Sequence, residues 1–492
     1  MMQTYSTLAA IDLGSNSFHL QVGRVEGEQL FYLDAIKESV RLAGGLNANK
    51  CLDGASQRRA LNCLARFGER LRGMPAGAVR AVGTSALRVA RNAPEFLEKA
   101  RAALGFEIEI VAGREEARLI YLGVSHSLPL NPEARLVVDI GGGSTECIIG
   151  SGYEPRDRES LRMGCVVFSN RFFPKGGIDK AAMKAAEIAA RIETRLVAGP
   201  VFGRSAWVEA VGSSGTARAL GEICRLNGHT SGHSDGAITL EGLRWLRERL
   251  IKAGDANQLD LPGLKLDRRP VIAGGLAIML GIFEELGVER MTVAQGAMRE
   301  GILWDLLGRV HDRDMRDITV GQFQRRYQVD MAQAGRVEAV ALALFPAARD
   351  EAAQRLAWAA RLHEIGISIA HSGFHKHGAY ILENADMPGF SRRDQVFMAL
   401  LVRAVRGGLD KLGLAPTAAE WPLILCLRLG ALFNMSRSDA VLPAITLRCE
   451  NGLCHLSLPA TWLKDNPLTR AALEGEVREW GKAAAGIRLE LA

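Results

Sequence analysis

Apolar residues in the first half of the chain alternate between short strand-like runs and longer helix-like runs. Residues 8–23 predict two strands joined by a tight turn, because apolar runs flank a cluster of small residues. Residues 55–72 place leucine and phenylalanine three and four positions apart, which predicts an amphipathic helix, and another helix is predicted over 94–104. A strand over 107–111 precedes a further helix from about Glu115. This alternation is typical of an α/β layered fold.

The same plan begins again after a proline-marked linker at residues 128–133. Residues 139–150 read DIGGGSTECIIG and align without a gap with residues 12–23, DLGSNSFHLQVG. Each stretch consists of an Asp, an aliphatic residue, a Gly, further small residues and an apolar run, and the two Asp residues are 127 positions apart. This spacing is a sensible size for a domain, so the sequence predicts a duplicated unit.

The pattern changes beyond about residue 305, where amphipathic helical runs dominate and no glycine-rich turn recurs. A short tail from residue 444 has strand character. We therefore predict an α/β protein with two duplicated lobes, an all-α domain and a small C-terminal α+β piece. The predicted boundaries are 1–127, 128–304, 305–440 and 441–492.

Composition excludes several classes of protein. With 48% hydrophobic and 24% charged residues, the chain has the composition of a globular protein rather than a disordered one. The first residues carry no basic segment followed by an apolar run, so neither a secretory signal nor a membrane span is expected, and we predict a cytoplasmic protein, without excluding peripheral membrane association. Eight scattered cysteines without CxxC spacing predict reduced, mostly buried thiols.

The charge pattern makes a polyanionic partner plausible. The net charge is only +6, but pairs of arginines recur along the chain, such as Arg268-Arg269 and Arg392-Arg393. Solvated surface is the alternative explanation for such pairs. Aromatic residues total 6% and are not interleaved with basic residues in any nucleic-acid motif, so no nucleic acid is expected as a partner.

Three turns of small residues are candidates for binding phosphate. Glycine lets backbone N–H groups approach a ligand, and consecutive amides in such a turn attract anions. A third turn precedes a helical run, which places its amides at a helix N-terminus. For one isolated turn, a plain hairpin is the better interpretation, but two aligned copies favour a phosphate cleft between two lobes. The candidate residues are Gly14, Ser15, Asn16, Ser17, Gly141, Gly142, Gly143, Ser144, Thr145, Ser213, Ser214, Gly215 and Thr216.

Acidic residues next to these turns suggest a metal ion. Asp139 and Glu146 cannot usefully contact a phosphate directly, since like charges repel, but both suit Mg²⁺, which prefers carboxylate, water and phosphate oxygens. We predict Asp139, Glu146 and Asp12 as the metal-binding residues.

Hydrolysis of a phosphoanhydride also needs a base that activates water. Glu115 and Glu116 lie at a predicted strand-to-helix junction, a place that often borders a cleft in such folds. Either glutamate could instead be a first-turn residue favoured by the helix dipole. Arg88 is a candidate clamp for phosphate oxygens, and a surface arginine is the alternative.

A series of motifs resembles one family. The motifs run in order from about Ala10 to beyond residue 400, and they are DLGSNSFHL, GTSALR, EEARLIYLGV, DIGGGSTE, GSSGT, GGLAIMLGIFE, GAMREGIL and HEIGISIAHSGFHKHGAYILENADMPGF. Together they resemble the bacterial exopolyphosphatase and guanosine pentaphosphate phosphohydrolase (Ppx/GppA) family, within the superfamily of actin, sugar kinases and heat-shock chaperones. The resemblance implies two RNase H-like (actin-like) lobes, in agreement with the duplication.

The resemblance also implies an activity and roles for residues. It implies release of orthophosphate from the ends of inorganic polyphosphate, processively, with Mg²⁺ and a monovalent K⁺ activator, by a homodimer. It assigns the catalytic base to Glu116, metal binding to Asp139 and Glu146, and phosphate contacts to Asp12, Arg88 and the three turns.

The predicted helical domain resembles HD-type phosphohydrolases, but it departs from their metal site. The chain has His363-Glu364 where those enzymes have an adjacent His-Asp pair. His371, His375 and His377 could in principle bind a metal, but metal ligands usually come with carboxylates at suitable spacing. Lining a basic path for the polymer, or simply packing, is the preferred interpretation.

Three alternatives to an exopolyphosphatase remain open. The first is a guanosine pentaphosphate 5'-phosphohydrolase using the same lobes and base. The second is a sugar or acetate kinase of the same superfamily, which needs a phosphoryl acceptor rather than water. The third is a protein that binds polyphosphate or nucleic acid without catalysis.

Overall fold

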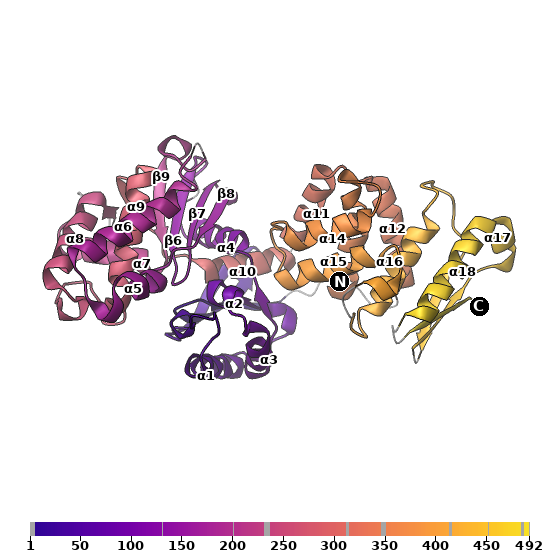
Figure 1. Ribbon diagram of the computed structural model, residues 1–492, viewed down its shortest axis with the longest axis horizontal. Coiled ribbons are helices and arrows are strands. Elements are labelled where there is room, and N and C mark those ends of the chain that lie inside the picture. Colours follow the sequence, from indigo (N-terminus) through magenta and orange to yellow (C-terminus); the bar gives the residue numbers. More distant parts are fainter. Residues whose placement is uncertain are drawn as a thin grey trace. The chain divides into compact units, whose positions relative to one another are not determined.

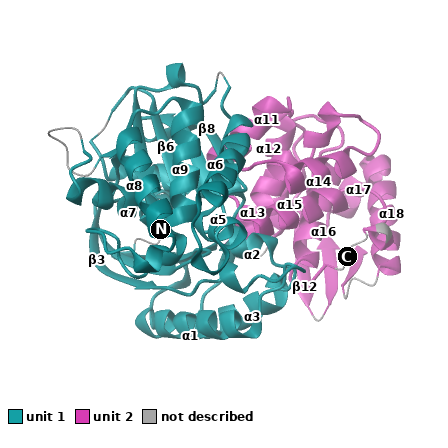
Figure 2. Cartoon of the chain, turned by 60° about the vertical axis from the view of Figure 1, so that its left-hand side comes forward, with its two compact units in different colours: residues 1–314 teal, residues 315–492 magenta. Residues whose placement is uncertain are grey.

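The computed structural model describes most of the chain, namely residues 5–129, 131–199, 201–230, 237–310, 314–345, 351–412, 416–450, 452–483 and 487–491. The chain packs into two units, residues 1–314 and residues 315–492, which we call unit 1 and unit 2 (Figure 2). The finer predicted boundaries at residues 127 and 440 stay predictions.

Unit 1 begins with a five-stranded sheet. Its strands are β1 (Thr7–Leu13), β2 (Phe18–Glu26), β3 (Gln29–Glu38), β4 (Val79–Gly83) and β5 (Ile108–Ile110). They lie in the order β3-β2-β1-β4-β5, with β1, β4 and β5 parallel and the hairpin neighbours antiparallel. The helices that accompany this sheet are α1 (Gly54–Arg70), α2 (Ser85–Val89), α3 (Ala93–Leu104) and α4 (Gly113–His126).

A second sheet of unit 1 repeats this plan (Figure 1). Its strands are β6 (Arg135–Ile140), β7 (Thr145–Ser151), β8 (Glu154–Leu161), β9 (Glu209–Ser213), β10 (Ile238–Thr239) and β11 (Arg290–Val293). The order β8-β7-β6-β9-β11 has the same strand directions as β3-β2-β1-β4-β5, and the short β10 is added at the edge. The matching topology confirms the duplicated α/β fold. The helices are α5 (Cys165–Phe172), α6 (Lys180–Arg195), α7 (Ser214–Leu226), α8 (Leu240–Ala253), α9 (Ile272–Leu286) and α10 (Met298–Val310).

The first strand of each sheet is buried on both faces, and its alternation sets the direction of the acidic residues. In β1, Ile11 packs into the core with α1 and α3, whereas Leu8 and Ala10 pack into a core shared by both sheets. In β6, Val137 belongs to the same shared core. Successive side chains of a strand point to opposite faces, so Asp12 and Asp139, two positions further along, lie on the side where the two sheets face each other.

Helices α4 and α10 pack closely in the shared core. A Cβ atom added at Gly301 would lie 1.7 Å from the carbonyl oxygen of Leu119, and one added at Gly123 would lie 2.0 Å from that of Ala297. Only glycine permits this backbone approach, because any side chain would collide with main-chain atoms. The contact therefore fixes the position of α4, which carries both candidate glutamates.

Unit 2 is mainly helical and ends in a small sheet. Its helices are α11 (Met315–Arg326), α12 (Met331–Leu344), α13 (Glu351–Leu362), α14 (Phe374–Asn384), α15 (Arg392–Ala404), α16 (Trp421–Phe433), α17 (Ala460–Asp465) and α18 (Pro467–Lys482). The sheet has the order β12-β13-β14, from β12 (Thr446–Glu450), β13 (Leu453–Ser457) and β14 (Arg488–Leu491). A helical region followed by a small α+β piece is the predicted architecture.

One prediction about the cysteines is wrong. Cys449 and Cys454 form a disulfide across the β12–β13 hairpin, where they are direct cross-strand partners. The six other cysteines are free, and of these only Cys51 is not buried. The expectation of reduced thiols failed at this pair because it relied on CxxC spacing, whereas a hairpin brings cysteines together at a separation set by its turn.

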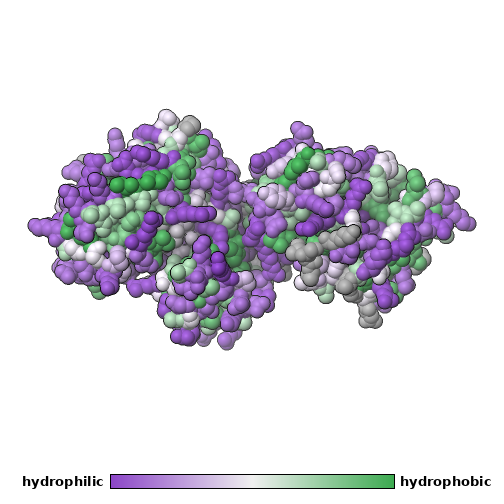
Figure 3. All heavy atoms as spheres, viewed as in Figure 1, coloured by the Kyte–Doolittle hydropathy of each residue, from purple (hydrophilic) through white to green (hydrophobic). Residues whose placement is uncertain are grey.

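No helix in the described part of the chain is long and apolar enough to cross a membrane. Hydrophilic residues predominate on the faces of both units that Figure 3 shows.

Candidate active site

A cleft of about 400 Å³ in unit 1 brings most of the predicted residues together. It lies where the β1–β2 turn, the β6–β7 turn and the N-terminus of α7 meet, at the ends of both sheets. The predicted residues that line it are Asp12, Gly14, Ser15, Asn16, Ser17, Glu116, Asp139, Gly141, Gly142, Gly143, Ser144, Ser214, Gly215 and Thr216.

The glycine turn after β6 is held by helix α5. The backbone N–H of Cys165 donates to the Gly141 carbonyl at 2.9 Å, and that of Val166 donates to the Gly142 carbonyl at 3.1 Å. A Cβ atom added at Gly164 would lie 2.4 Å from the Gly142 backbone, so this approach also requires glycine. The Gly141 N–H donates to the Ser144 carbonyl at 2.9 Å, so the N–H groups of Gly142 and Gly143 are those that the turn can offer to an anion.

Four predicted residues do not line the cleft. The Thr145 hydroxyl donates to the Met163 carbonyl at 2.6 Å, and the Ser213 hydroxyl donates to the Gly296 carbonyl at 3.2 Å, so both serve the backbone. Arg88 and Glu146 lie beside the cleft and contact other side chains.

The hydroxyls of the third turn that line the cleft also have structural roles. Ser214 and Thr216 both donate to the Ile140 carbonyl at 3.0 Å, which fixes the start of α7 against the end of β6. Their backbone N–H groups belong to the first turn of α7, where that of Thr216 donates to Ser214 Oγ at 3.3 Å. The remaining unpaired amides of this helix start could bind an anion in the cleft.

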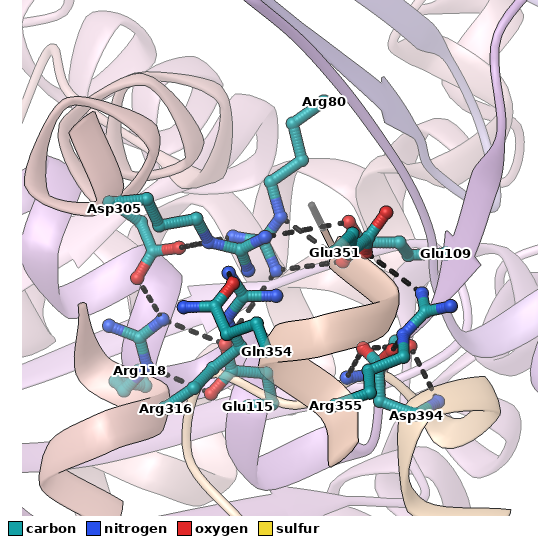
Figure 4. A network of polar contacts seen from close by, with 12 residues as sticks. Arg80, Glu109, Glu115, Arg118, Asp305, Arg316, Glu351, Gln354, Arg355 and Asp394 are labelled. Carbon is teal, nitrogen blue, oxygen red and sulfur yellow. Dashed lines mark hydrogen bonds and ion pairs between the residues drawn. The ribbon is translucent and has the colours of Figure 1, made fainter. Parts of the chain in front are cut away.

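The two adjacent glutamates of α4 have different surroundings. Glu116 lines the cleft and is 7% exposed, and its Oε2 accepts a hydrogen bond from Arg88 Nη1 at 3.1 Å. Glu115 accepts from Arg118 Nε at 2.8 Å in a buried ionic network (Figure 4). In this network Arg118 also contacts Asp305 of α10, and Arg80 Nη1 donates to Asp305 at 2.6 Å.

This network ties α4 to β4 and α10, so Glu115 is a structural residue in this position. Glu116 keeps one oxygen, Oε1, without a hydrogen bond to the described part of the protein. Of the two glutamates, only Glu116 is placed to meet a ligand in the cleft.

Four acidic groups are buried together at the cleft. Burial, together with the charges of Glu116 and Asp139, raises the pKa of Asp12 to about 8. Burial raises the pKa of Asp139 to about 6, and it also raises the pKa of Glu116 against the opposing effect of Arg88. Glu146, whose carboxylate accepts from Ser160 Oγ at 2.8 Å, has its pKa raised by burial and by Glu116 and Asp139. The site therefore concentrates negative charge that favours protonation or a bound cation.

A group of cations that lines the same cleft was not predicted as a group. Four cations line it, namely Lys37 of β3, Arg218 of α7, Arg299 of α10 and Arg268, which precedes η6 (Arg269–Val271). They surround His19, whose pKa is lowered to about 3 by burial and by these four charges, with Arg299 foremost. The neutral ring accepts a hydrogen bond at Nδ1 from Arg299 Nη1 at 3.1 Å.

Sequence alone gave only a weak signal for these cations. Arg299 and His19 lie inside the motifs GAMREGIL and DLGSNSFHL, and Arg268 belongs to one of the arginine pairs noted above, whereas Lys37 and Arg218 lie outside recognisable patterns. Only the fold brings them together, and together they form a surface that suits a polyanion.

The donor set fits a divalent cation that retains water. Asp12 Oδ1 is buried and has no hydrogen-bond partner among the described residues. No group of three or more His, Cys, Asp or Glu residues in the described part of the chain is arranged to hold a metal ion. Mg²⁺ is commonly held by one or two carboxylates, with water and phosphate oxygens completing its shell, so the site suits Mg²⁺ better than a metal that needs a complete protein cage.

The histidines of unit 2 have a different environment. His375 is near Phe374 and is surrounded by the charges of Lys376, Arg406 and Arg403, which together with burial lower its pKa. Basic surroundings of this kind suit an anion better than a metal cation.

Two family models match this chain over most of its length. The model of the Ppx/GppA phosphatase family matches residues 22–310, and that of Ppx/GppA phosphatase, domain III, matches residues 315–477. Solved structures with the same fold include an exopolyphosphatase from Cytophaga hutchinsonii, with 24% identity over 61% of this chain and 97% of that chain and a TM-score of 0.55. The Aquifex aeolicus PPX-GPPA enzyme has 25% identity, covering 61% of this chain and 98% of that chain, with a TM-score of 0.50.

The two family matches adjoin at the boundary between units 1 and 2, and the first contains the cleft apart from the residues of the β1–β2 hairpin before residue 22. The chain belongs to the Ppx/GppA phosphatase family, with its actin-like lobes followed by domain III.

Proposed function

We propose that this phosphatase is an exopolyphosphatase that hydrolyses the terminal phosphoanhydride bond of inorganic polyphosphate. The observation that carries the proposal is the division of one cleft into a buried carboxylate, Glu116, main-chain turns rich in N–H groups, and a group of four cations. Each part answers a requirement of the reaction: a base for water, a cradle for the terminal phosphate, and positive charge for the rest of the chain.

Glu116 is the proposed general base. Arg88 holds Oε2, so Oε1 is the oxygen that accepts a proton from water. Burial raises the pKa of this carboxyl group and makes the carboxylate a stronger base than an exposed glutamate. The activated water oxygen attacks the terminal phosphorus and the bond from that phosphorus to the bridging oxygen breaks. The attacked phosphorus leaves as orthophosphate, and the bridging oxygen stays on the shortened chain as a terminal phosphate oxygen. The proton on Glu116 leaves with the products or returns to solvent.

The turns and cations are proposed to position the polymer. The N–H groups of Gly142 and Gly143 and the unpaired amides at the α7 N-terminus bind oxygens of the terminal phosphates. Arg299, Arg218 and Lys37 neutralise the phosphates that follow. Mg²⁺ held by carboxylates among Asp12, Asp139 and Glu146 would screen charge on the terminal anhydride, and K⁺ remains a proposal from the family resemblance.

The lining of the cleft favours the inorganic polymer over guanosine pentaphosphate. Among the described residues that line it, His19 is the only one with an aromatic ring, and its hydrogen bond to Arg299 ties it to the cationic group. A guanine base commonly binds by stacking on an aromatic side chain and by paired hydrogen bonds. The cleft is instead rich in backbone amides and positive charge, which bind phosphate regardless of a base.

The test compares two neighbouring substitutions. Glu116→Gln should lower kcat for orthophosphate release from long polyphosphate by about a hundredfold or more, since it removes the general base while preserving shape. Glu115→Gln is the matched control on the same helix, and it should lower thermal stability through the Arg118 network while kcat of the folded enzyme changes by less than about fivefold. Equal kcat values for Glu116→Gln and the native enzyme would refute the base assignment.

A second measurement tests the substrate. Initial rates with long polyphosphate and with guanosine pentaphosphate, each varied in concentration with Mg²⁺ present, give two values of kcat/KM. The proposal requires the larger value for polyphosphate. A larger value for the nucleotide would instead support a guanosine pentaphosphate phosphohydrolase with the same catalytic base.

A further inference from the structure

Unit 1 contains a second cavity of about 470 Å³ that the proposed reaction does not use. It lies between α5, the following 3₁₀ helix η3 (Pro174–Gly176), η5 (Ala256–Gln258) and η6 (Arg269–Val271), which leads into α9. A volume of this size is within the range of pockets that hold small molecules rather than single ions.

Two polar groups at this cavity are buried without a hydrogen-bond partner among the described residues. Ser169 is 5% exposed, and its hydroxyl has no hydrogen-bond partner among the described residues. Arg269 Nε is also buried and without such a partner, although Arg269 Nη1 donates to the Asn257 carbonyl at 2.7 Å. Leaving buried donors without acceptors is costly, so these two groups indicate a missing acceptor in the cavity.

The charges at the cavity favour an anion. Lys175 and Arg269 both line it, and neither forms an ion pair with a described residue. The one carboxylate in the lining, Asp255, has its Oδ1 occupied by the backbone N–H of Asn257 at 2.8 Å and by its Nδ2 at 3.0 Å. Two cations therefore face one carboxylate that is already bound locally, and the remaining donors suit an oxyanion with several acceptor atoms.

The other walls of the cavity are apolar. Phe173 and Ile178 are 5% and 4% exposed, and Ala273 and two prolines complete this side. A free phosphate ion would leave such walls without contact. The combination of an apolar wall and a cationic end is suited to an organic phosphate, with its ring or carbon part on Phe173 and its phosphate near Arg269 and Lys175.

We propose that this cavity is a second binding site, for a small organic phosphate of about nucleotide size. Two segments connect it with the catalytic cleft. Helix α5 holds the Gly141–Gly143 turn through Cys165 and lines the second cavity one turn later through Ser169. Arg268 lines the catalytic cleft, and the next residue, Arg269, lines the second cavity. A ligand that draws in Ser169 or Arg269 acts on the same helix and peptide that shape the catalytic cleft.

Binding is tested by calorimetric titration of the full-length protein with ADP, and with pyrophosphate as the probe without an organic part. Four proteins are compared, namely the native chain, Lys175→Gln combined with Arg269→Gln, Arg299→Gln in the catalytic cleft, and Arg249→Gln as an exposed control on α8. Lys175→Gln alone serves as a milder variant if the double variant does not fold, because Lys175 is exposed.

The expected result is two ADP sites on the native chain and on Arg249→Gln. The double variant should weaken one site by about tenfold or more, and Arg299→Gln should weaken the other. Pyrophosphate should bind the second cavity more weakly than ADP. Identical ADP titrations of native protein and the Lys175 variants would overturn the proposal and leave ordered water as the occupant. Equal affinities of the second cavity for ADP and pyrophosphate would show that it does not recognise the organic part of the ligand.

The connection with the catalytic cleft has its own readout, which rests on the proposed function. At saturating polyphosphate, ADP should change kcat of the native enzyme and should not change kcat of Lys175→Gln. An unchanged native kcat despite binding at the second cavity would refute the connection. Failure to hydrolyse polyphosphate would refute the proposed function, while the calorimetric result would still decide whether the cavity binds an organic phosphate.

Discussion

The two glycine hairpins of unit 1 have the same geometry and opposite chemistry. Asp12 in β1 and Asp139 in β6 occupy matching positions before their turns. The residue directly across the hairpin is His19 in the first copy and Glu146 in the second. His19 accepts a hydrogen bond from Arg299 and is surrounded by cations, whereas Glu146 is buried near Glu116 and Asp139.

This difference shows how a duplicated fold produces an asymmetric cleft. The shared turn supplies backbone amides from both sides, and the cross-strand position carries a neutral histidine among cations in the first copy and a buried glutamate among acids in the second. A reaction that must bind a polyanion and activate water needs both kinds of surface close together. Substitutions at the paired positions test whether this division of charge determines activity.

Among the substitutions that test this comparison, the largest effect is expected for Glu146→Gln. This change keeps the shape of the side chain and an acceptor for Ser160, but it removes one of the negative charges proposed to hold Mg²⁺. We expect kcat/KM for polyphosphate to fall by about ten- to a hundredfold, with a higher Mg²⁺ concentration needed for half-maximal rate. An unchanged Mg²⁺ dependence would contradict a metal role for Glu146.

A smaller effect is expected when the first hairpin is made to resemble the second. His19→Glu places a negative charge beside Arg299 and the other cations, which should raise KM for polyphosphate by about tenfold, with a smaller change in kcat. His19→Gln keeps a neutral acceptor for Arg299 and is the control. Similar KM values for the two variants would show that charge at this position does not influence polymer binding.

Replacing Arg88 should change the pH dependence rather than abolish the reaction. Arg88 opposes the effect of burial and keeps the pKa of Glu116 lower than burial alone would set it. In Arg88→Gln the pKa of Glu116 should rise further, so the base becomes protonated at a higher pH and the acidic limb of the kcat/KM profile moves to higher pH. The profile is measured at saturating Mg²⁺, and a limb that stays in place would argue against titration of Glu116.

The smallest expected effect is on stability, and its pH dependence comes from ionisation of Asp12. Burial raises the folded-state pKa of this carboxyl from its ordinary value of 3.8 to about 8, so the stabilisation it contributes is fully present below pH 3.8 and is lost as pH rises through 8. Asp12→Asn removes this dependence. In the presence of a chelator, its Tm should exceed the native Tm by roughly 2–5 °C at pH 9, with a smaller difference at pH 4. A constant difference at all pH values would show that ionisation of Asp12 is not the cause.

The sequence predicted the parts of the site that depend on local patterns. Alternation along β1 and β6, the aligned glycine turns and the position of Glu116 at the start of α4 are all set within short stretches, and the structure brings the two turns and Glu116 to one cleft. Sequence reasoning alone could not separate Glu115 from Glu116, because their difference depends on Arg118 and Asp305, and Asp305 is nearly two hundred positions away.

The rest could not be predicted because it depends on packing between distant segments. Lys37, Arg218, Arg268 and Arg299 become one cationic group only when two helices, a turn and an edge strand are assembled. The hydroxyls of Thr145 and Ser213 were predicted for phosphate, but they bond to the backbone, since the turns need those contacts to keep their shape. The roles assigned to the acids and the metal stay predictions until the substitutions above are measured.

The backbone contact between α4 and α10 restricts how this enzyme can be altered. Main-chain atoms of the two helices are separated at Gly123 and Gly301 by hydrogen atoms alone, so no larger residue fits without pushing Glu116 away from the turns. Substitutions at this helix contact therefore cannot adjust the catalytic geometry. Glycine has no side chain to shorten, and there is no space for a longer one. Variation in activity among engineered forms should come from the turns and the surrounding cations, while this helix contact remains invariant.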